Sequence, residues 1–160
     1  ENAFGSRLMT NGGFWRNNEL TDFSFKSFKK GKKIANNVEP GKRPRSSMAP
    51  TIILKNNKPV YILGSPGGSN IIGYVINAII SMIDWKNNAQ EAASVAHGIN
   101  KFGTYYLEKK TIMSKLLPSL EAMKYKVKLR SFSSGLNSIH INDKLYGGSD
   151  HRREGIAVGN

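Results

Sequence analysis

The chain reads Val60-Tyr61-Ile62-Leu63-Gly64-Ser65-Pro66-Gly67-Gly68-Ser69 where a β-branched run meets a glycine-rich turn, and this stretch decides the fold. A second such run, Thr51-Ile52-Ile53-Leu54, precedes it by a short polar loop, which predicts a β-hairpin. After the turn, apolar residues recur at the three- and four-residue spacing of a helix: Ile72, Val75, Ile76, Ile79, Ile80 and Ile83. Because this helix is apolar around most of its circumference, we expect it to pack against a sheet.

The rest of the chain shows further helical and strand patterns. Helices are expected over 89–96 and 113–124, and strands over 105–107, 127–130, 139–141 and 145–146. Residues 26–45 are basic with little periodicity, which predicts a mobile surface loop. Strands at both ends of the ordered part with helices between them predict the α+β class, in a single domain of residues 1–160.

The composition excludes several classes of protein. The 160 residues include no cysteine, so a disulfide-stapled mini-protein, a thiolate zinc site and a cysteine nucleophile are ruled out. The most apolar stretch, 71–83, is too short to cross a bilayer, so no integral membrane segment is expected. His97, His140 and His151 lie far apart and outside any metal-ligand pattern, so we expect no metal and no cofactor. His97 is expected to end a helix, where its charge would suit the helix dipole.

The net charge of +13 raises nucleic acid or an anionic membrane as partners. Only the run Lys26–Lys33 is dense in lysine, and the other basic residues are spread along the chain. No zinc finger, helix-turn-helix or RNA-binding strand motif is present. A solvated face is the competing interpretation, so the charge is weak evidence of function.

The glycine turn is the strongest local feature for chemistry. Consecutive glycines let the backbone approach a ligand closely, and the first N–H groups of the following helix lack internal partners. Such a turn suits a phosphate, a carboxylate or the oxyanion of acyl transfer. It matches neither the P-loop nor the dinucleotide-binding pattern. A turn needed only for close packing remains the alternative.

Two other groups of residues could bind a charged substrate. The neighbouring hydroxyls of Ser46 and Ser47 precede a predicted strand and could donate hydrogen bonds to a carboxylate. The acids Glu1, Glu19 and Asp22 all lie in the first 22 residues of a very basic chain and could bind an ammonium group. The alternatives are an ordinary loop for the serines and helix capping or plain solvation for the acids.

Five segments occur in this order along the chain: Glu1-Asn2-Ala3-Phe4-Gly5-Ser6-Arg7, Asn17-Asn18-Glu19-Leu20-Thr21-Asp22-Phe23, Pro40-Gly41-Lys42-Arg43-Pro44-Arg45-Ser46-Ser47-Met48-Ala49-Pro50-Thr51, Gly64-Ser65-Pro66-Gly67-Gly68-Ser69 and Leu145-Tyr146-Gly147-Gly148-Ser149-Asp150. Together they closely resemble the small subunit of gamma-glutamyltranspeptidase, the glutathione hydrolase family. The resemblance runs from Glu1 to Asn160.

The resemblance implies a fold and a reaction. Family members are N-terminal-nucleophile hydrolases with an αββα sandwich, of which this chain would form half. A precursor cleaves itself into a large and a small subunit, and the new N-terminal Thr of the small subunit attacks the γ-glutamyl carbonyl of glutathione or another γ-glutamyl compound. The glutamyl group then passes to water or to an acceptor amino acid or peptide. The partner implied is the large subunit.

The resemblance also implies roles for single residues. Gly67 and Gly68 look like the oxyanion hole, and Ser46 and Ser47 look like donors to the substrate α-carboxylate. Glu1, Glu19 and Asp22 look like acceptors for its α-ammonium. These roles agree with the interpretation from the residues themselves, because an anion-binding turn, a serine pair and an acid cluster complement one glutamyl group.

Two departures from the family pattern affect what is expected of this chain. The nucleophilic Thr should stand shortly before Glu1, and Thr10 and Thr21 are internal, so the isolated chain is expected to be inert. Asn70 stands where a basic residue is common after the Gly-Gly-Ser turn. The family resemblance further implies a periplasmic or secreted protein.

Two alternative functions remain open at this point. One is a cephalosporin-acylase-like amidase of the same superfamily, whose glutaryl-type substrate has no ammonium for the acids to bind. The other, of a different class, is a basic module that binds nucleic acid or an anionic membrane and would be retained on heparin with a steep salt dependence.

Overall fold

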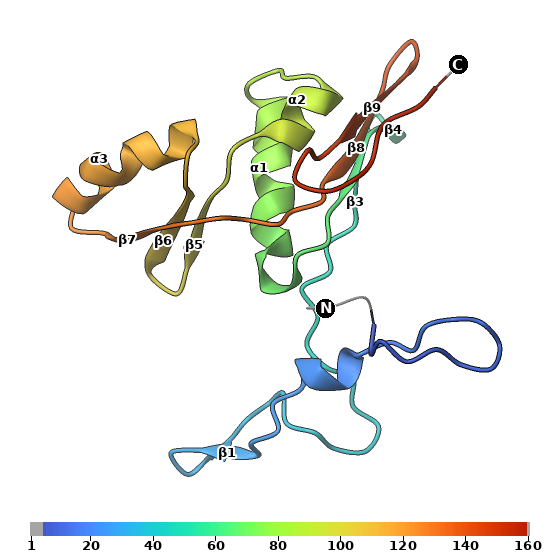
Figure 1. The fold of residues 1–160 in the computed structure, drawn as a ribbon, viewed down its shortest axis with the longest axis vertical. Coiled ribbons are helices and arrows are strands. Elements are labelled where there is room, and N and C mark those ends of the chain that lie inside the picture. The colour runs from blue at the N-terminus through green and yellow to red at the C-terminus, as the bar shows by residue number, and fades with distance from the viewer. Residues whose placement is uncertain (1–4, 160) are drawn as a thin grey trace. The chain divides into compact units, whose positions relative to one another are not determined.

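The computed structural model describes residues 5–159, and the chain divides into two compact units, one up to Ser47 and one from Met48 onward. Figure 1 shows the elements of each unit. The two larger sheets and the helices α1, α2 and α3 belong to the second unit, so the α+β class predicted from the sequence is confirmed there.

A four-stranded antiparallel sheet forms one part of the second unit. Its strands lie in the order β3 (Thr51–Lys55), β4 (Lys58–Gly64), β8 (Asn137–Ile141) and β9 (Leu145–Ser149). The predicted hairpin is confirmed, because β3 and β4 are joined at Asn56 and Asn57, which both take positive φ, 52° and 61°. Two left-handed residues match the twist of paired strands, and asparagine tolerates that conformation better than most residues.

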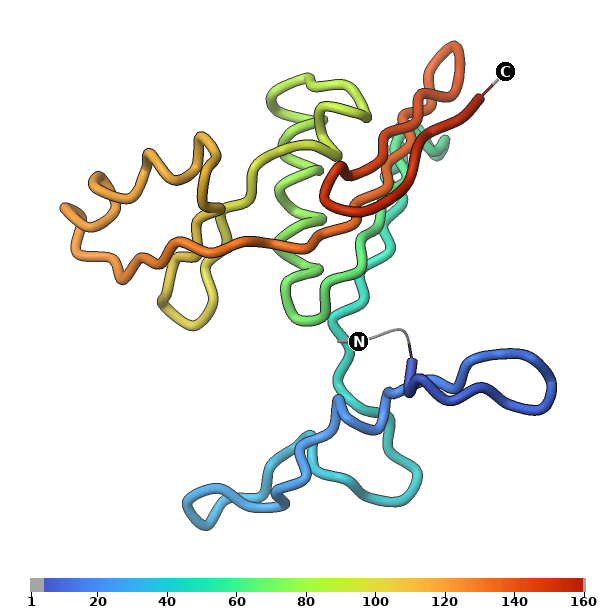
Figure 2. Tube along the Cα trace, in the orientation of Figure 1, coloured from blue at the N-terminus to red at the C-terminus, as the bar shows by residue number. Residues whose placement is uncertain are grey.

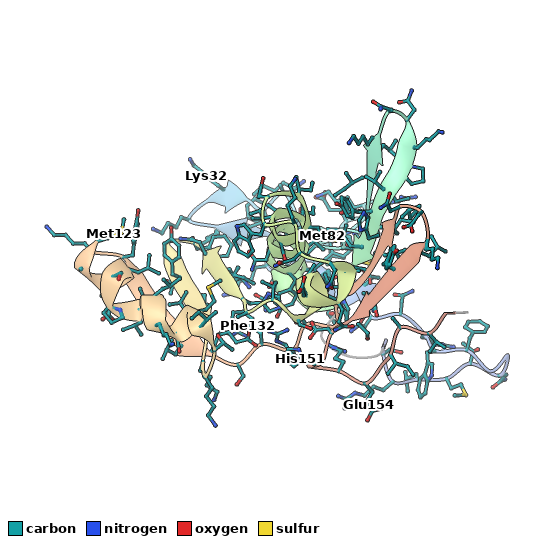
Figure 3. The ribbon with its side chains drawn as sticks, turned by 90° about the horizontal axis from the view of Figure 1, so that it is seen from above. Lys32, Met82, Met123, Phe132, His151 and Glu154 are labelled. Atoms are coloured by element: carbon teal, nitrogen blue, oxygen red, sulfur yellow. The ribbon has the colours of Figure 1, made fainter. Side chains whose placement is uncertain are left out.

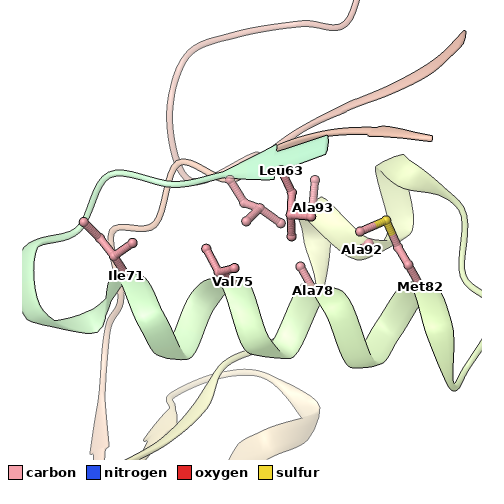
Figure 4. Close-up of a cluster of buried hydrophobic side chains, with 8 residues drawn as sticks. Leu63, Ile71, Val75, Ala78, Met82, Ala92 and Ala93 are labelled. Atoms are coloured by element: carbon pink, nitrogen blue, oxygen red, sulfur yellow. The ribbon is translucent and has the colours of Figure 1, made fainter. Parts of the chain in front are cut away.

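Helix α1 (Ile71–Ile83) follows the glycine turn, as predicted, and lies between the two larger sheets (Figure 1). One side of it packs against the four-stranded sheet and α2 (Ala89–Ser94) in a cluster of buried side chains (Figure 4): Leu63, Ile71, Val75, Ala78, Met82, Ala92, Ala93 and Leu136. Asn88 and Glu91 fix the start of α2, since each accepts a hydrogen bond from the other's backbone N–H, at 2.9 and 2.8 Å. None of the helices within residues 5–159 has the length and apolarity that a membrane span requires.

The other side of α1 faces a three-stranded sheet. Its strands are β5 (Gly98–Lys101), β6 (Thr104–Glu108) and β7 (Lys126–Arg130), with β5 antiparallel and β7 parallel to β6. The helix approaches β5 closely, because a Cβ at Gly73 would lie 2.8 Å from Ile99 Cδ1. Residues 131–136 then run from β7 across α1 to β8 (Figure 2), and Phe132, labelled in Figure 3, packs edge-on against Tyr74 with ring centroids 5.9 Å apart.

The connection between β6 and β7 differs from the single helix predicted over 113–124. It consists of a 3-10 helix, η3 (Ile112–Leu116), and a short α-helix, α3 (Leu117–Ala122). Pro118 lies in the first turn of α3, where a backbone N–H would have no helical partner, so its absence removes no hydrogen bond. The same missing N–H ends the hydrogen-bond pattern of the preceding 3-10 helix.

The first unit is built from short elements: η1 (Glu19–Asp22), β1 (Phe28–Lys29) and β2 (Lys32–Lys33). Residues 26–45, predicted as a mobile surface loop, contain the hairpin of β1 and β2, which turns at Lys30 and Gly31 with positive φ. Glu39 forms ion pairs with Lys33 and Lys42, and these hydrogen bonds lower the pKa of Glu39 to about 2. Part of the dense positive charge is therefore used to hold this unit together.

Gly148 of β9 allows α2 to approach the sheet. A Cβ there would overlap the carbonyl group of Ala89 and lie 2.7 Å from the Gln90 nitrogen, and these are backbone atoms that cannot rotate away. We therefore expect Gly148→Ala to lower the stability of the full-length gene product by about 1–3 kcal/mol, which is the usual effect of overpacking. Thermal unfolding measures this.

The matched control for Gly148 is Gly98→Ala. A Cβ at Gly98 would meet Leu107 Cδ2 and Met113 Sδ at 3.5 Å, which is ordinary van der Waals contact. The melting temperature of this variant is expected to stay close to that of the wild type. If Gly148→Ala melted at the same temperature as Gly98→Ala, the contact between β9 and α2 would not be as tight as the structure shows.

Candidate active site

The glycine turn between β4 and α1 has a backbone that only glycine adopts readily. Gly67 has φ 141° and ψ 15°, and Gly68 has φ 55° and is buried. Within residues 5–159, neither Gly67 nor Gly68 donates its backbone N–H to another group of the protein. Because a 13-residue helix begins just after them, these N–H groups lie at the positive end of its dipole. The turn is therefore suited to bind an anion or a developing oxyanion.

A lysine from the three-stranded sheet adds positive charge at this turn. The Lys101 ammonium, at the end of β5, donates hydrogen bonds to Ser69 Oγ at 2.6 Å and to Asn70 Oδ1 at 3.4 Å. Asn70 departs from the family pattern, in which a basic residue is common at this position. The fold nevertheless places a cation beside Asn70, because Lys101, 31 residues further along the chain, contacts its side chain. Local sequence patterns do not reveal Lys101, because they do not predict the strand β5 on which it lies.

The acids of the first unit lie on η1. Glu19 and Asp22 are the first and last residues of this 3-10 helix. The Oδ2 atom of Asp22 is buried and has no hydrogen-bond partner in the described part of the chain. A buried carboxylate oxygen without a donor is costly, which is consistent with a site for an external donor such as an ammonium group. Glu1, the third acid of the predicted cluster, lies outside the described residues.

The serine pair is tied to the same small unit by Asn36. The Asn36 side chain donates to the Asp22 carbonyl oxygen at 2.7 Å and accepts from the Arg45 N–H at 2.8 Å, one residue before Ser46. Ser46 is exposed and Ser47 is half-buried, and Ser46 also has an interaction partner. The Asn36 side chain therefore links η1, which carries Glu19 and Asp22, to the segment that carries Ser46 and Ser47. Asn36 was not among the residues that the sequence singled out.

A buried ion cluster lies at the end of the second unit. The Arg152 guanidinium donates to both carboxylate oxygens of Glu108 at 2.6 Å and to Asp150 Oδ1 at 3.0 Å. Burial alone would raise the pKa of Glu108, but the hydrogen bonds from Arg152 and from the His97 N–H outweigh it, so the pKa is lowered. The pKa of Asp150 is lowered as well, against its burial, by hydrogen bonds from the Ser134 hydroxyl, from backbone N–H groups and from the Arg152 side chain, so both carboxylates are held in the charged form.

His97 joins this cluster in a way the sequence analysis did not predict. It follows α2 rather than ending it, and it is fully buried, not placed as a charge at a helix end. The Ser134 hydroxyl donates to Asp150 Oδ2 at 2.5 Å, so its oxygen accepts from His97 Nε2 at 2.8 Å. This arrangement assigns the ring proton to Nε2. The other nitrogen, Nδ1, is buried and has no partner within the described residues.

Burial, and to a smaller extent the nearby Arg152 charge, lower the pKa of His97 to about 4, against the opposing effect of Glu108 and Asp150. His97 is therefore a neutral hydrogen-bond donor at neutral pH. The hydrogen-bond partner of its ring, Ser134, lies 37 residues away along the chain, which is why local sequence patterns did not reveal this contact.

Comparisons with known proteins agree with the family resemblance. The family model of gamma-glutamyltranspeptidase matches residues 1–160. The chain is 35% identical over 164 residues to a glutathione hydrolase proenzyme of Bacillus subtilis strain 168, covering 99% of this chain and 27% of that protein. The structure resembles the crystal structure of the Helicobacter pylori gamma-glutamyltranspeptidase T380A mutant with a TM-score of 0.83 and 35% identity, over 96% of this chain and 89% of that one.

A more distant likeness bears on the acylase alternative. The cephalosporin acylase of Bacillus halodurans matches with a TM-score of 0.73 and 20% identity, covering 88% of this chain and 26% of that chain. Such a likeness shows a shared fold and nothing of substrate. The chain spans about a quarter of the length of the curated relative it matches.

Proposed function

The chain belongs to the gamma-glutamyltranspeptidase family, and from this premise we propose that it is part of an enzyme that cleaves the γ-glutamyl amide of glutathione. The glutamyl group would pass to water or to an acceptor amino acid or peptide. The observation that carries the proposal is the Gly67–Gly68 turn, whose two N–H groups have no partner among the described residues and lie at the start of α1.

The proposal gives a role in recognition to each group of residues that the family resemblance singles out. The hydroxyls of Ser46 and Ser47 donate to the α-carboxylate of the glutamyl group, and the carboxylates of Glu1, Glu19 and Asp22 accept from its α-ammonium. The N–H groups of Gly67 and Gly68 receive the carbonyl oxygen as it becomes an oxyanion. The unpartnered Oδ2 of Asp22 supports its role as an acceptor.

The nucleophile and the partner come from the rest of the protein. The proposed reaction needs an N-terminal Thr, and Thr10 and Thr21 have chain on both sides, so neither carries the required free amine. The relatives are named proenzymes, and this chain spans 27% of the one from Bacillus subtilis. We therefore propose that it acts with a large subunit released from the same precursor.

A comparison of two substrates tests the proposal. The full-length gene product is offered γ-glutamyl-p-nitroanilide and glutaryl-p-nitroanilide, which differ only in the α-ammonium group. We expect kcat/KM to be at least about 10²-fold higher for the γ-glutamyl compound, because without the ammonium the acids are left unpaired. Asp22→Asn is expected to reduce this ratio by about tenfold or more.

Asp143→Asn is the matched control. Asp143 is an exposed carboxylate between β8 and β9, and it accepts a hydrogen bond from the Tyr146 hydroxyl at 3.0 Å. The ratio of the two substrates is expected to be unchanged in this variant. Equal kcat/KM for both substrates in the wild type would contradict the proposal and favour the acylase-like alternative.

A further inference from the structure

The glycine turn is supported on one side by the ring of Tyr74. A Cβ at Gly67 would overlap Tyr74 Cε2, so the ring lies directly against the backbone of the turn. Tyr74 is itself 1% exposed, and burial raises the pKa of its hydroxyl. The position of the Gly67 backbone therefore depends on where this buried ring lies.

The turn has a second support in the segment that crosses α1. The Gly135 N–H donates to Ser65 Oγ at 3.2 Å, and a Cβ at Gly135 would lie 3.0 Å from Pro66 Cγ. Gly135 follows Ser134, whose hydroxyl is held between His97 and Asp150. The crossing segment is therefore fixed next to the first residues of the turn by the buried hydrogen bonds described above.

Both supports meet at His97. Its ring lies against that of Tyr74 with centroids 4.4 Å apart, and its Nε2–H donates to Ser134 Oγ. The charged and titratable groups around it are Arg152, Glu108, Asp150 and His151. Because burial lowers the pKa of its ring, His97 contributes packing and one neutral ring hydrogen bond rather than a charge.

We infer that His97 is a positioning residue for the reaction: it holds the Gly67–Gly68 turn in place through the Tyr74 ring and through Ser134, whose neighbour Gly135 contacts Ser65 and Pro66. This inference rests on the proposed function for its effect on rate. The effect of His97 on the turn passes through these two buried neighbours. A displacement of an oxyanion site by about 1 Å lowers reaction rates by about 10²-fold, so small shifts in these supports are measurable.

Single-turnover kinetics of the full-length gene product test the effect on rate. With enzyme in saturating excess over γ-glutamyl-p-nitroanilide, the first-order rate constant for nitroaniline release does not depend on the fraction of enzyme that is folded. His97→Met removes the N–H donor and is expected to lower this constant by about tenfold or more. His97→Gln keeps an N–H at nearly the same place and is expected to stay within about threefold of the wild type.

Ser134→Ala is a second and smaller change to the same support, and Ser133→Ala is its matched control. Ser134 is buried between His97 and Asp150, whereas Ser133 is exposed. The rate constant is expected to fall in Ser134→Ala and not in Ser133→Ala. A purely structural role for His97 and Ser134 would change the amount of active enzyme and leave the rate constants equal.

Amide hydrogen exchange of the same variants tests the inference without reference to activity. We expect residues 64–71 to exchange faster in His97→Met and Ser134→Ala than in His97→Gln and Ser133→Ala. Two results would overturn the inference. In the first, the exchange rates and the single-turnover rate constants of His97→Met and Ser134→Ala equal those of the wild type. In the second, His97→Gln lowers the rate constant as much as His97→Met does. If the wild type releases no nitroaniline, the proposed function fails, while the exchange comparison still decides whether His97 holds the turn.

Discussion

Gly67→Ala is expected to lower kcat/KM of the full-length gene product for γ-glutamyl-p-nitroanilide by at least about 10²-fold. The backbone of Gly67 has φ 141°, which residues with a side chain rarely adopt, and a Cβ would overlap the buried ring of Tyr74. Relief of this overlap requires the turn to move, and its N–H groups then no longer point at the developing oxyanion. Steady-state kinetics with matched melting curves measure the loss.

Gly98→Ala serves as the control for this substitution also. It adds the same methyl group within the second unit, where it makes only ordinary contacts. We expect its kcat/KM to lie within about threefold of the wild type. A Gly67→Ala enzyme with full activity would show that the turn is required only for packing, which is the alternative that the sequence left open.

Arg152→Met is expected to lower the stability of the full-length gene product by about 3–5 kcal/mol at neutral pH. Methionine replaces much of the arginine stem, but it leaves Glu108 and Asp150 buried without their cation. A change of this size shifts the melting temperature of a domain of 150–250 residues by about 6–20 °C. Thermal unfolding at pH 7 measures the effect.

The pH dependence of this difference provides a second measurement. The pKa values of Glu108 and Asp150 are lowered in the folded chain, although burial alone would raise them. Their ion pairs therefore stabilise the fold above the ordinary carboxylate pKa values, near 4, and this stabilisation is lost as the pH falls below them. The gap in melting temperature between Arg152→Met and the wild type should accordingly narrow in acid.

Arg153→Met is the matched control for Arg152. Arg153 is exposed and donates to the Ser133 carbonyl oxygen at 3.0 and 3.2 Å, and it forms no ion pair with a carboxylate of residues 5–159. Its replacement is expected to change stability by less than about 1 kcal/mol. Equal destabilisation by both variants would show that the buried cluster contributes no more than a surface contact.

Local sequence patterns predicted the elements around the glycine turn well. The hairpin of β3 and β4 and the start of α1 follow from β-branched runs, two asparagines and a clear helical period, all of which act over a few residues. The strand β5 was missed because Gly98-Ile99-Asn100-Lys101 has little β propensity of its own. It is a strand because it pairs with β6 and packs Ile99 against Gly73.

The candidate site was predicted in part. Gly67 and Gly68 were identified from the turn alone, and the serines and acids from their chemistry together with the family resemblance. Lys101, Asn36 and His97 were not identified, because their contacts join residues that lie 9 to 37 positions apart in the chain. Such contacts depend on the tertiary fold and leave no periodic signal in the sequence.

The order of strands in the four-stranded sheet has a consequence for how the chain folds during its synthesis. β4 pairs with β8, so that Tyr61 lies opposite His140, nearly 80 residues further along the chain. Until the ribosome has added β8, the β3–β4 hairpin exposes an unpaired edge that other chains can join. Contacts of such high sequence separation also form slowly. We therefore expect this part of the protein to depend on chaperones between the emergence of β4 and that of β9.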